Sequence, residues 1–194
     1  MLVDRITKAF MFNKEVYSEV EHDTSFTTTA WIIVAATAFL GSLGSTFGAG
    51  GFDQPATGIV GVLVGTVVGI IGFAVGTAVI TWVGQTVFKA EVTFDELVRT
   101  LGLAYIWRVL GVISIVGAFS PALACVAAPI SLAAAIAGLF SWFIAAKEAL
   151  DLDWTQTIVT VLLGWAAIMA ITFFTALILG MLGLGAAGLA GAFR

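Results

Sequence analysis

Arg108 is the one charged residue that lies inside a long apolar stretch of this chain. The eight residues before it are uncharged, and from Val109 to Ala146 there is no Asp, Glu, Lys or Arg. Ionisable side chains inside a bilayer are costly to place and commonly serve a function. The pattern therefore makes Arg108 the first candidate for a binding or ion-pairing site.

The guanidinium of Arg108 could act in three ways. Because Arg108 follows Arg99 by nine residues, about 13 Å along a helix, its side chain could reach back to the lipid headgroups. It could pair with Glu148 or Asp151, which end the apolar stretch that follows, or bind a lipid phosphate or another anion. The candidate lipid, anion or ion-pair site comprises Arg108, Tyr105, Glu148 and Asp151.

The other reactive residues form no catalytic or metal-binding pattern. His22 is the only histidine, and one imidazole does not supply the ligands of a metal site. Its ligation of a pigment or haem stays an alternative. Cys125 is the only cysteine, so an intrachain disulfide is excluded. We expect no catalytic residue, no metal and no cofactor, and the net charge of −4 excludes nucleic-acid binding.

A glycine-striped segment over 57–83 is the element around which the chain is organised. At about 100° per residue, its glycines fall within roughly an 80° arc of one helix, spaced in part as Gly-x-x-x-Gly. In lipid such a face lets a second helix approach closely. A buried helix of a soluble protein is the alternative, but the rest of the chain is just as apolar. The helix-packing candidates are Gly58, Gly61, Gly65, Gly69, Gly72 and Gly76.

Composition places the chain in the membrane. Of 194 residues, 60% are hydrophobic and only 10% are charged, against about 25% in soluble domains, and the mean hydropathy is +1.11. We therefore expect an all-α, polytopic integral membrane protein with no soluble domain. Charges throughout residues 1–23 argue against a cleavable signal peptide.

Segments long enough to span about 30 Å need about 20 apolar residues, and the sequence offers five. Capping patterns mark the helix starts: Thr93 with Glu96, Ser120 before Pro121, and Asp153 with Gln156. Pro129 should kink the fourth span. The predicted spans are 28–47, 57–83, 97–118, 121–147 and 154–179.

The chain divides into three parts. Residues 1–26 form an amphipathic segment, in which Asn13 can cap a second short helix; it lies on the membrane surface or docks on a partner. Residues 27–180 form the five-helix membrane domain. Residues 181–194 form a glycine-rich tail.

The distribution of Lys and Arg predicts the orientation. With the N-terminus inside, six cationic residues lie on the cytoplasmic side and one, Arg194, lies outside. The positive-inside rule favours this arrangement. We expect a multi-pass protein of the cell (plasma) membrane, with a cytoplasmic N-terminus and the C-terminus outside.

Three segments carry a family resemblance. They are 13–23 before the first span, 94–105 with Val109-Leu110-Gly111 in the third, and 149–157 before the fifth. These segments resemble the Yip-domain proteins, the Ypt/Rab-interacting-protein family. One departure is Trp107, which stands where the family often has a proline, two residues after the tyrosine matching Tyr105.

The resemblance implies a non-catalytic membrane protein. Eukaryotic relatives are tied to Rab GTPases, membrane traffic and mutual association, whereas the short N-terminal segment here is similar to that of prokaryotic members. We expect an organiser or adaptor of the bilayer, or an accessory subunit that associates with itself or with other integral membrane proteins. A small transporter or channel is the alternative. An intramembrane enzyme is the third hypothesis, and no residues support it.

Overall fold

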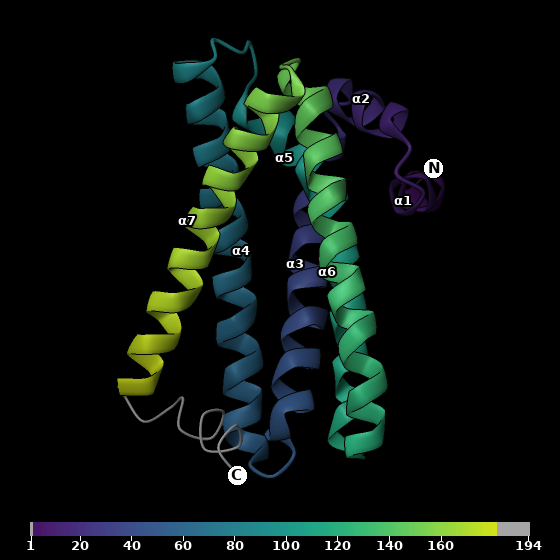
Figure 1. The fold of residues 1–194 in the computed structure, drawn as a ribbon, viewed down its shortest axis with the longest axis vertical. Coiled ribbons are helices and arrows are strands. Elements are labelled where there is room, and N and C mark those ends of the chain that lie inside the picture. The colour runs from purple at the N-terminus through teal and green to yellow at the C-terminus, as the bar shows by residue number, and fades with distance from the viewer. Residues whose placement is uncertain (1, 182–194) are drawn as a thin grey trace.

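The fold is an all-α bundle with five helices long and apolar enough to cross a membrane, as predicted. The computed structural model describes residues 2–181, and Figure 1 shows their arrangement. The predicted tail lies outside the described residues, apart from Met181. The elements are α1 (Leu2–Phe10), α2 (Lys14–His22), α3 (Phe26–Thr46), η1 (Phe47–Gly51), α4 (Pro55–Val87), α5 (Phe94–Ala104), η2 (Tyr105–Ala118), α6 (Pro121–Leu150) and α7 (Trp154–Met181).

Helix α3 stands at the centre of the bundle. It packs against α4 on one side and against α5 and η2 on the other. Helix α7 covers α4, and α6 covers η2. Helices α6 and α7 meet beside their short link and then diverge (Figure 1). The bundle is therefore closed around α3 and open between α6 and α7.

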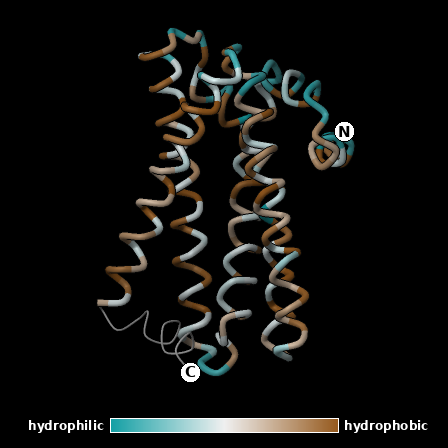
Figure 2. The backbone as a smooth tube through the Cα atoms, viewed as in Figure 1, coloured by the Kyte–Doolittle hydropathy of each residue, from teal (hydrophilic) through white to brown (hydrophobic). Residues whose placement is uncertain are grey.

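Polar residues gather at one end of the bundle, which we call the charged end. It carries α1, α2, the α4–α5 link and the α6–α7 link, and Figure 2 shows hydrophilic residues concentrated there. The opposite end holds the η1–α4 link with Asp53. Between the two ends the helices are apolar, which matches the hydrocarbon layer of a membrane.

The helix starts follow the predicted capping chemistry. Thr93 and Glu96 form a reciprocal capping box at α5. The Ser120 side chain accepts from the amide of Ala122 at α6, and the Asn13 side chain accepts from that of Glu15 at α2. Asp153 and Gln156 likewise exchange hydrogen bonds before α7. Pro129 lies inside α6, which continues through it as one helix.

The third span differs from the single α-helix that the sequence predicts. It begins as α5 and continues from Tyr105 to Ala118 as a 3₁₀-helix, a form that is uncommon beyond a few residues. The stretch is rich in glycine and β-branched residues, which favour the α-helix less. It also lies backbone to backbone against α3 near Gly111 and Ser114. The change of helix type at Tyr105 occurs although Trp107 replaces the proline frequent in relatives.

Candidate functional site

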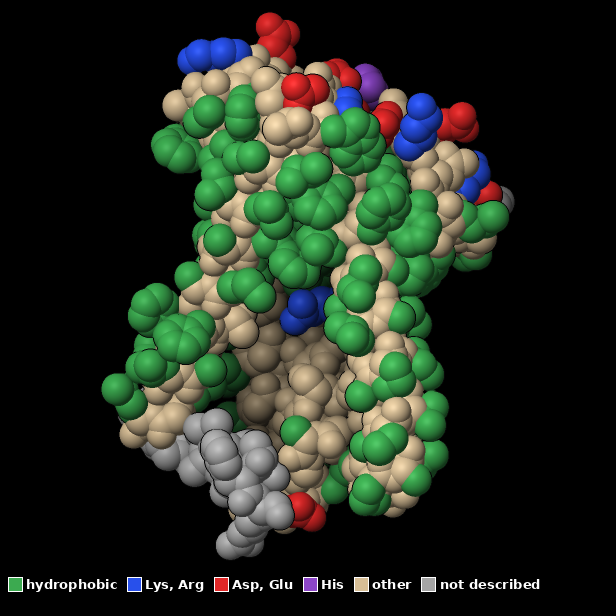
Figure 3. Space-filling model, viewed as in Figure 1, with side chains coloured by type: hydrophobic (Ala, Val, Ile, Leu, Met, Phe, Trp, Pro, Cys, Tyr) green, Lys and Arg blue, Asp and Glu red, His purple; other side chains and the backbone are tan. Residues whose placement is uncertain are grey.

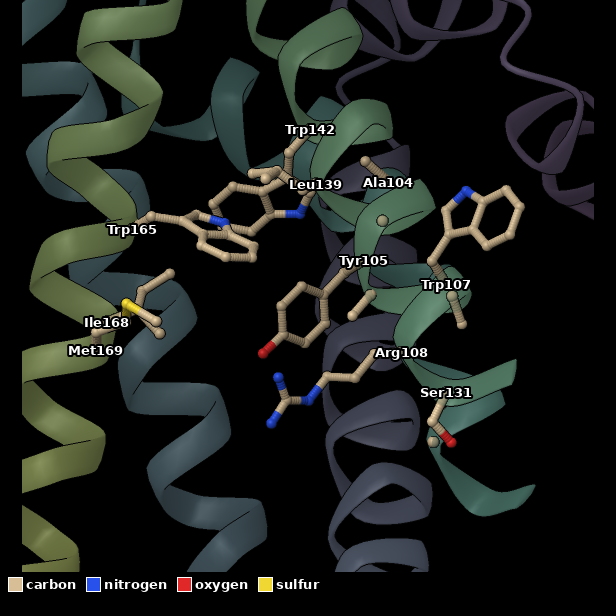
Figure 4. A pocket seen from close by; sticks show the side chains of 14 residues that line it. Ala104, Tyr105, Trp107, Arg108, Ser131, Leu139, Trp142, Trp165, Ile168 and Met169 are labelled. Carbon is tan, nitrogen blue, oxygen red and sulfur yellow. The ribbon is translucent and has the colours of Figure 1, made fainter. Parts of the chain in front are cut away.

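Arg108 points into a hollow on the side of the bundle. The hollow has a volume of about 260 Å³ and is lined by residues of α5, η2, α6 and α7. Figure 3 shows a blue cationic side chain at its inner end, between the green side chains of α6 and α7, and Figure 4 labels Arg108 there. The first turn of η2 therefore aims the guanidinium between the two helices that diverge.

The aliphatic part of the Arg108 side chain passes α3 beside Gly41. A methyl group added at Gly41 would lie 3.3 Å from Cγ of Arg108, so Gly41 leaves room for the side chain to pass. The guanidinium carbon lies 5.4 Å from the centre of the Tyr105 ring, within reach of a cation–π attraction. Of the four candidate site residues, the structure thus brings together Arg108 and Tyr105.

Glu148 and Asp151 lie elsewhere. The three salt bridges among residues 2–181 are all in the N-terminal helices, and none involves Arg108. Trp107, the neighbour of Arg108, contacts α6 at Gly138, and Glu148 follows ten residues later, about 15 Å along the helix. The carboxylates therefore belong to the charged end, whereas Arg108 is placed well below it.

An aromatic cluster separates the hollow from the charged end. The ring of Phe73 lies 5.2 Å from that of Tyr105 and 6.0 Å from that of Trp142, both edge-on, and it also contacts Trp31 at 5.5 Å. The Tyr105 hydroxyl donates to the backbone carbonyl of Gly69 at 3.4 Å. Such edge-to-face packing fixes ring orientation, so the inner end of the hollow has a rigid wall.

The sides of the hollow are apolar. Helix α6 supplies Leu139 and Trp142, and α7 supplies Trp165, Ile168 and Met169 (Figure 4). Ser131 also lines it and contacts the Ser114 hydroxyl at 3.2 Å. No Asp or Glu is among the lining residues that the structure describes. Arg108 is therefore a cation in a hollow with no carboxylate on its walls.

The glycine face of α4 packs against the first span, formed by α3 and η1, and against α7. A methyl group at Gly58 would lie 2.8 Å from the Gly51 carbonyl, one at Gly65 2.8 Å from the Ser42 hydroxyl, and one at Gly76 2.6 Å from Ile168 of α7. Gly61 and Gly69 face α3, and Gly72 faces α7. The arc therefore changes partner part-way along α4.

The tightest helix crossing was not anticipated from the sequence. A methyl group at Gly44 of α3 would lie 2.0 Å from the Gly111 carbonyl oxygen, and one at Gly48 2.4 Å from that of Ser114. The spacing of Gly41, Gly44 and Gly48 was a signal available in the sequence. It places Gly41 and Gly44 of α3 and Gly48 of η1 on one side of the first span, where small residues let two backbones meet.

Arg99 is buried, although its place in the sequence predicts only a cytoplasmic charge. The residue is 5% exposed. Its Nε donates to the carbonyls of Val20 and Glu21 at 3.1 and 2.9 Å, and Nη1 donates to the Thr27 hydroxyl. The guanidinium thus satisfies carbonyls at the C-terminal end of α2, where cations are favoured.

Further contacts hold the N-terminal helices. The Tyr17 hydroxyl lies 2.6 Å from that of Ser141 on α6, and burial raises the pKa of Tyr17 to about 12. The Phe12 ring stacks on Trp107 at 5.1 Å, with Phe12 in a left-handed conformation at φ 56°. Helices α1 and α2 are therefore docked on α5, η2 and α6, in addition to any contact with the membrane surface.

The remaining candidates stay isolated. His22 lies on α2 and its Nδ1 bonds to the Ser18 carbonyl at 2.9 Å; that bond and the charge of Glu21 raise its pKa. Cys125 is exposed on α6. Within residues 2–181 no group of three or more His, Cys, Asp or Glu could hold a metal ion.

Five apolar helices and a docked amphipathic pair define a multi-pass, all-α integral membrane protein. A comparison with protein families gives the particular group: the Yip1 domain matches residues 8–176. The chain therefore belongs to the Yip1 domain family, as its resemblance indicated. Neither the curated proteins nor the solved structures contain a match to it.

Proposed function

We propose that the protein is a non-catalytic membrane organiser or adaptor, acting as an accessory subunit of a larger membrane-protein assembly. The observation that carries this proposal is the docking of α2 by Arg99; Arg5 of α1 is in turn paired with Glu19 and Asp23. An adaptor must present a surface in a fixed orientation, and here a buried guanidinium fixes α2 to the membrane helices. The partners would be other integral membrane proteins, either copies of this chain or different ones.

The surface available for such a partner includes α1. Val3 of α1 and Met11 in the turn that follows it are 76% and 73% exposed although apolar. Arg5 of α1 is paired with Glu19 of α2 and with Asp23, the C-terminal cap of α2. Ion pairs therefore hold α1 to α2 and leave its apolar residues outward. Exposed apolar residues of this kind support binding to a protein or a membrane surface.

Purification from native membranes in mild detergent tests the adaptor function. We expect a complex heavier than the monomer, with an integral membrane protein present in fixed stoichiometry. Val3→Asp should reduce the yield of that protein, whereas the neighbouring change Asp4→Asn should leave it unchanged. A monomer carrying only lipid, in wild-type and variants alike, would contradict the proposal.

The proposed orientation has a cytoplasmic N-terminus in the plasma membrane. The cationic residues of the charged end support it, because cytoplasmic segments are enriched in Lys and Arg. In a Cys125→Ser background, an impermeant maleimide should label Ala192→Cys in intact cells and Met11→Cys only after the cells are opened. Labelling of both from one face would overturn the topology.

A small transporter or channel is the second candidate, favoured by a single observation. Arg108 faces the hollow rather than a packed helix, as a residue on an anion pathway would. The aromatic cluster of Tyr105, Phe73 and Trp142 lies between the hollow and the charged end. Anion flux in proteoliposomes that Arg108→Gln abolishes would favour transport, and flux equal to that of empty liposomes would remove this candidate.

A further inference from the structure

We propose that the hollow between α6 and α7 binds one anionic phospholipid, with its phosphate on the guanidinium of Arg108 and its acyl chains along the diverging faces of the two helices. This inference goes beyond the organiser function and does not depend on it. It assigns a ligand class to a cavity, whereas the proposed function concerns a protein partner.

The first argument is the charge of Arg108. An arginine near the middle of a membrane helix costs about 2.5–3.5 kcal/mol on the insertion scale. No Asp or Glu lies on the described walls of the hollow, and Arg108 is in none of the salt bridges among residues 2–181. An anion from outside the chain is therefore the partner that would compensate the charge.

The second argument is the geometry of the guanidinium. Figure 4 shows its two terminal nitrogens directed away from the helix and into the hollow. A planar guanidinium can donate two parallel N–H groups to a phosphate. The Tyr105 ring beside it, at 5.4 Å, restricts the orientation of the side chain. The donors are thus held toward the space that a ligand would enter.

The third argument is the chemistry of the walls. Trp142 and Trp165 lie above Arg108 in Figure 4, and Ile168 and Met169 lie along α7. In Figure 3 the hollow continues from the cationic side chain away from the charged end. A cavity of about 260 Å³ holds a phosphate and the start of its chains, and it is open to the bilayer between α6 and α7. An amphiphile suits these walls better than a free anion, which would face apolar surface on both sides.

The fourth argument separates anionic from zwitterionic lipids. A choline or ethanolamine headgroup places a cation next to its phosphate, and no Asp or Glu on the described walls of the hollow balances that cation. The acidic residues nearest in sequence along α6, Glu148 and Asp151, lie at the charged end. Arg108 and a headgroup ammonium would therefore compete for one phosphate. A lipid such as phosphatidylglycerol avoids this competition.

Native mass spectrometry of the purified full chain tests the proposal. The protein is equilibrated in detergent with equal amounts of phosphatidylglycerol and phosphatidylcholine. We expect one retained lipid, with phosphatidylglycerol favoured at least fivefold. Arg108→Gln should bring the ratio to about one, and Arg108→Lys should keep a reduced preference because the charge remains. Equal retention of both lipids by the wild type would overturn the proposal.

Three controls locate the binding and its source. Lys147→Gln removes one positive charge from α6 at the charged end and should leave the preference unchanged; an equal loss in both variants would overturn the site. Inorganic phosphate added in millimolar excess should not displace the lipid, and displacement would assign the site to a soluble anion instead. Phosphatidylglycerol with brominated chains should quench the tryptophan fluorescence of the wild type more than that of the Trp165→Phe variant. Equal quenching of the two proteins would place the lipid outside the hollow.

Discussion

Two pairs of helices in this bundle meet in opposite ways. Helices α3 and η2 touch backbone to backbone, with a methyl group at Gly44 placed only 2.0 Å from the Gly111 carbonyl. Helices α6 and α7 meet beside their link and then diverge around the hollow that contains Arg108 (Figures 1 and 3). The first contact brings two backbones together, and the second leaves space for a ligand.

The difference follows from which residues face inward. In lipid, helices associate through close packing of small residues rather than through hydrophobicity. Helix α3 presents Gly41 and Gly44 to η2, and Gly48 of η1 continues the row. On the hollow, α6 and α7 present the large side chains of Trp142 and Trp165. The closed contact therefore has small residues facing inward, and the open one has large residues.

The largest expected effect is at the closed contact. Gly44→Ala should destabilise the bundle by about 3 kcal/mol, the upper end of the usual cost of overpacking, because the clash is with backbone and the helices must separate. Gly72→Ala is the matched control, since its methyl group would meet Ile168 at an ordinary 3.5 Å. Thermal unfolding in detergent, followed by circular dichroism, measures both. Similar melting temperatures for the two variants would contradict the close backbone contact between α3 and η2.

A second test concerns the glycine face of α4. Gly65→Leu and Gly69→Leu should disrupt folding, because Ser42 and Ala38 of α3 occupy the space. Val67→Leu should be tolerated, since Val67 is 54% exposed. Monodispersity on size-exclusion chromatography distinguishes these outcomes. Equal tolerance of leucine at the three positions would remove the packing role proposed for the arc.

A third test concerns the docking of α2 on the membrane helices by Arg99. Arg99→Lys should release α2 while leaving the five spans intact, because a lysine cannot replace the fork that bonds to Val20, Glu21 and Thr27. We expect cleavage by trypsin at Lys14 to accelerate at least tenfold. An unchanged rate would show that Arg99 does not hold α2.

The smallest effect is expected at the Tyr17–Ser141 contact. Tyr17→Phe should cost about 1 kcal/mol and leave the Ser141 hydroxyl without its partner. The double variant Tyr17→Phe/Ser141→Ala should then cost less than the sum of the two single changes. Strict additivity in a double-mutant cycle would mean that the two hydroxyls do not interact.

The same residue predicts a dependence on alkaline pH. Because the folded protein raises the pKa of Tyr17 from 10 to about 12, its stabilising contribution is complete below pH 10 and is lost as pH rises towards 12. Wild type should therefore lose more stability than Tyr17→Phe over that interval. Parallel pH profiles would contradict the burial of this hydroxyl.

Most of the helical framework could be predicted from the sequence. The lengths of the apolar segments predict the five spans. Side-chain capping predicts the starts of three of them, because Thr93, Ser120 and Asp153 accept hydrogen bonds from amides a few residues away. Local chemistry of this kind depends only on neighbours in the chain. The 3₁₀ form after Tyr105 could not be predicted, since the crossing with α3 is a contact between distant segments.

The site was predictable only in part. Arg108 stood out because a charge in an apolar stretch is visible without a structure, and Tyr105 lies on the adjoining turn. Its expected pairing with Glu148 or Asp151 required knowing how far α6 extends past η2, which depends on the register of the two helices. The burial of Arg99 also depends on tertiary packing, because α2 covers it from a segment about 80 residues earlier.

The central claim is that the space beside Arg108 is filled by lipid rather than water, and the environment of Met169 tests it most directly. A nitroxide at Met169→Cys in the Cys125→Ser background would line the hollow, with Val67→Cys as the lipid reference and Met11→Cys as the exposed reference. In phosphatidylglycerol bilayers we predict frequent collisions with oxygen and few with a water-soluble nickel chelate, as at Val67. Collisions with the chelate as frequent as at Met11 would show a water-filled passage and contradict the account.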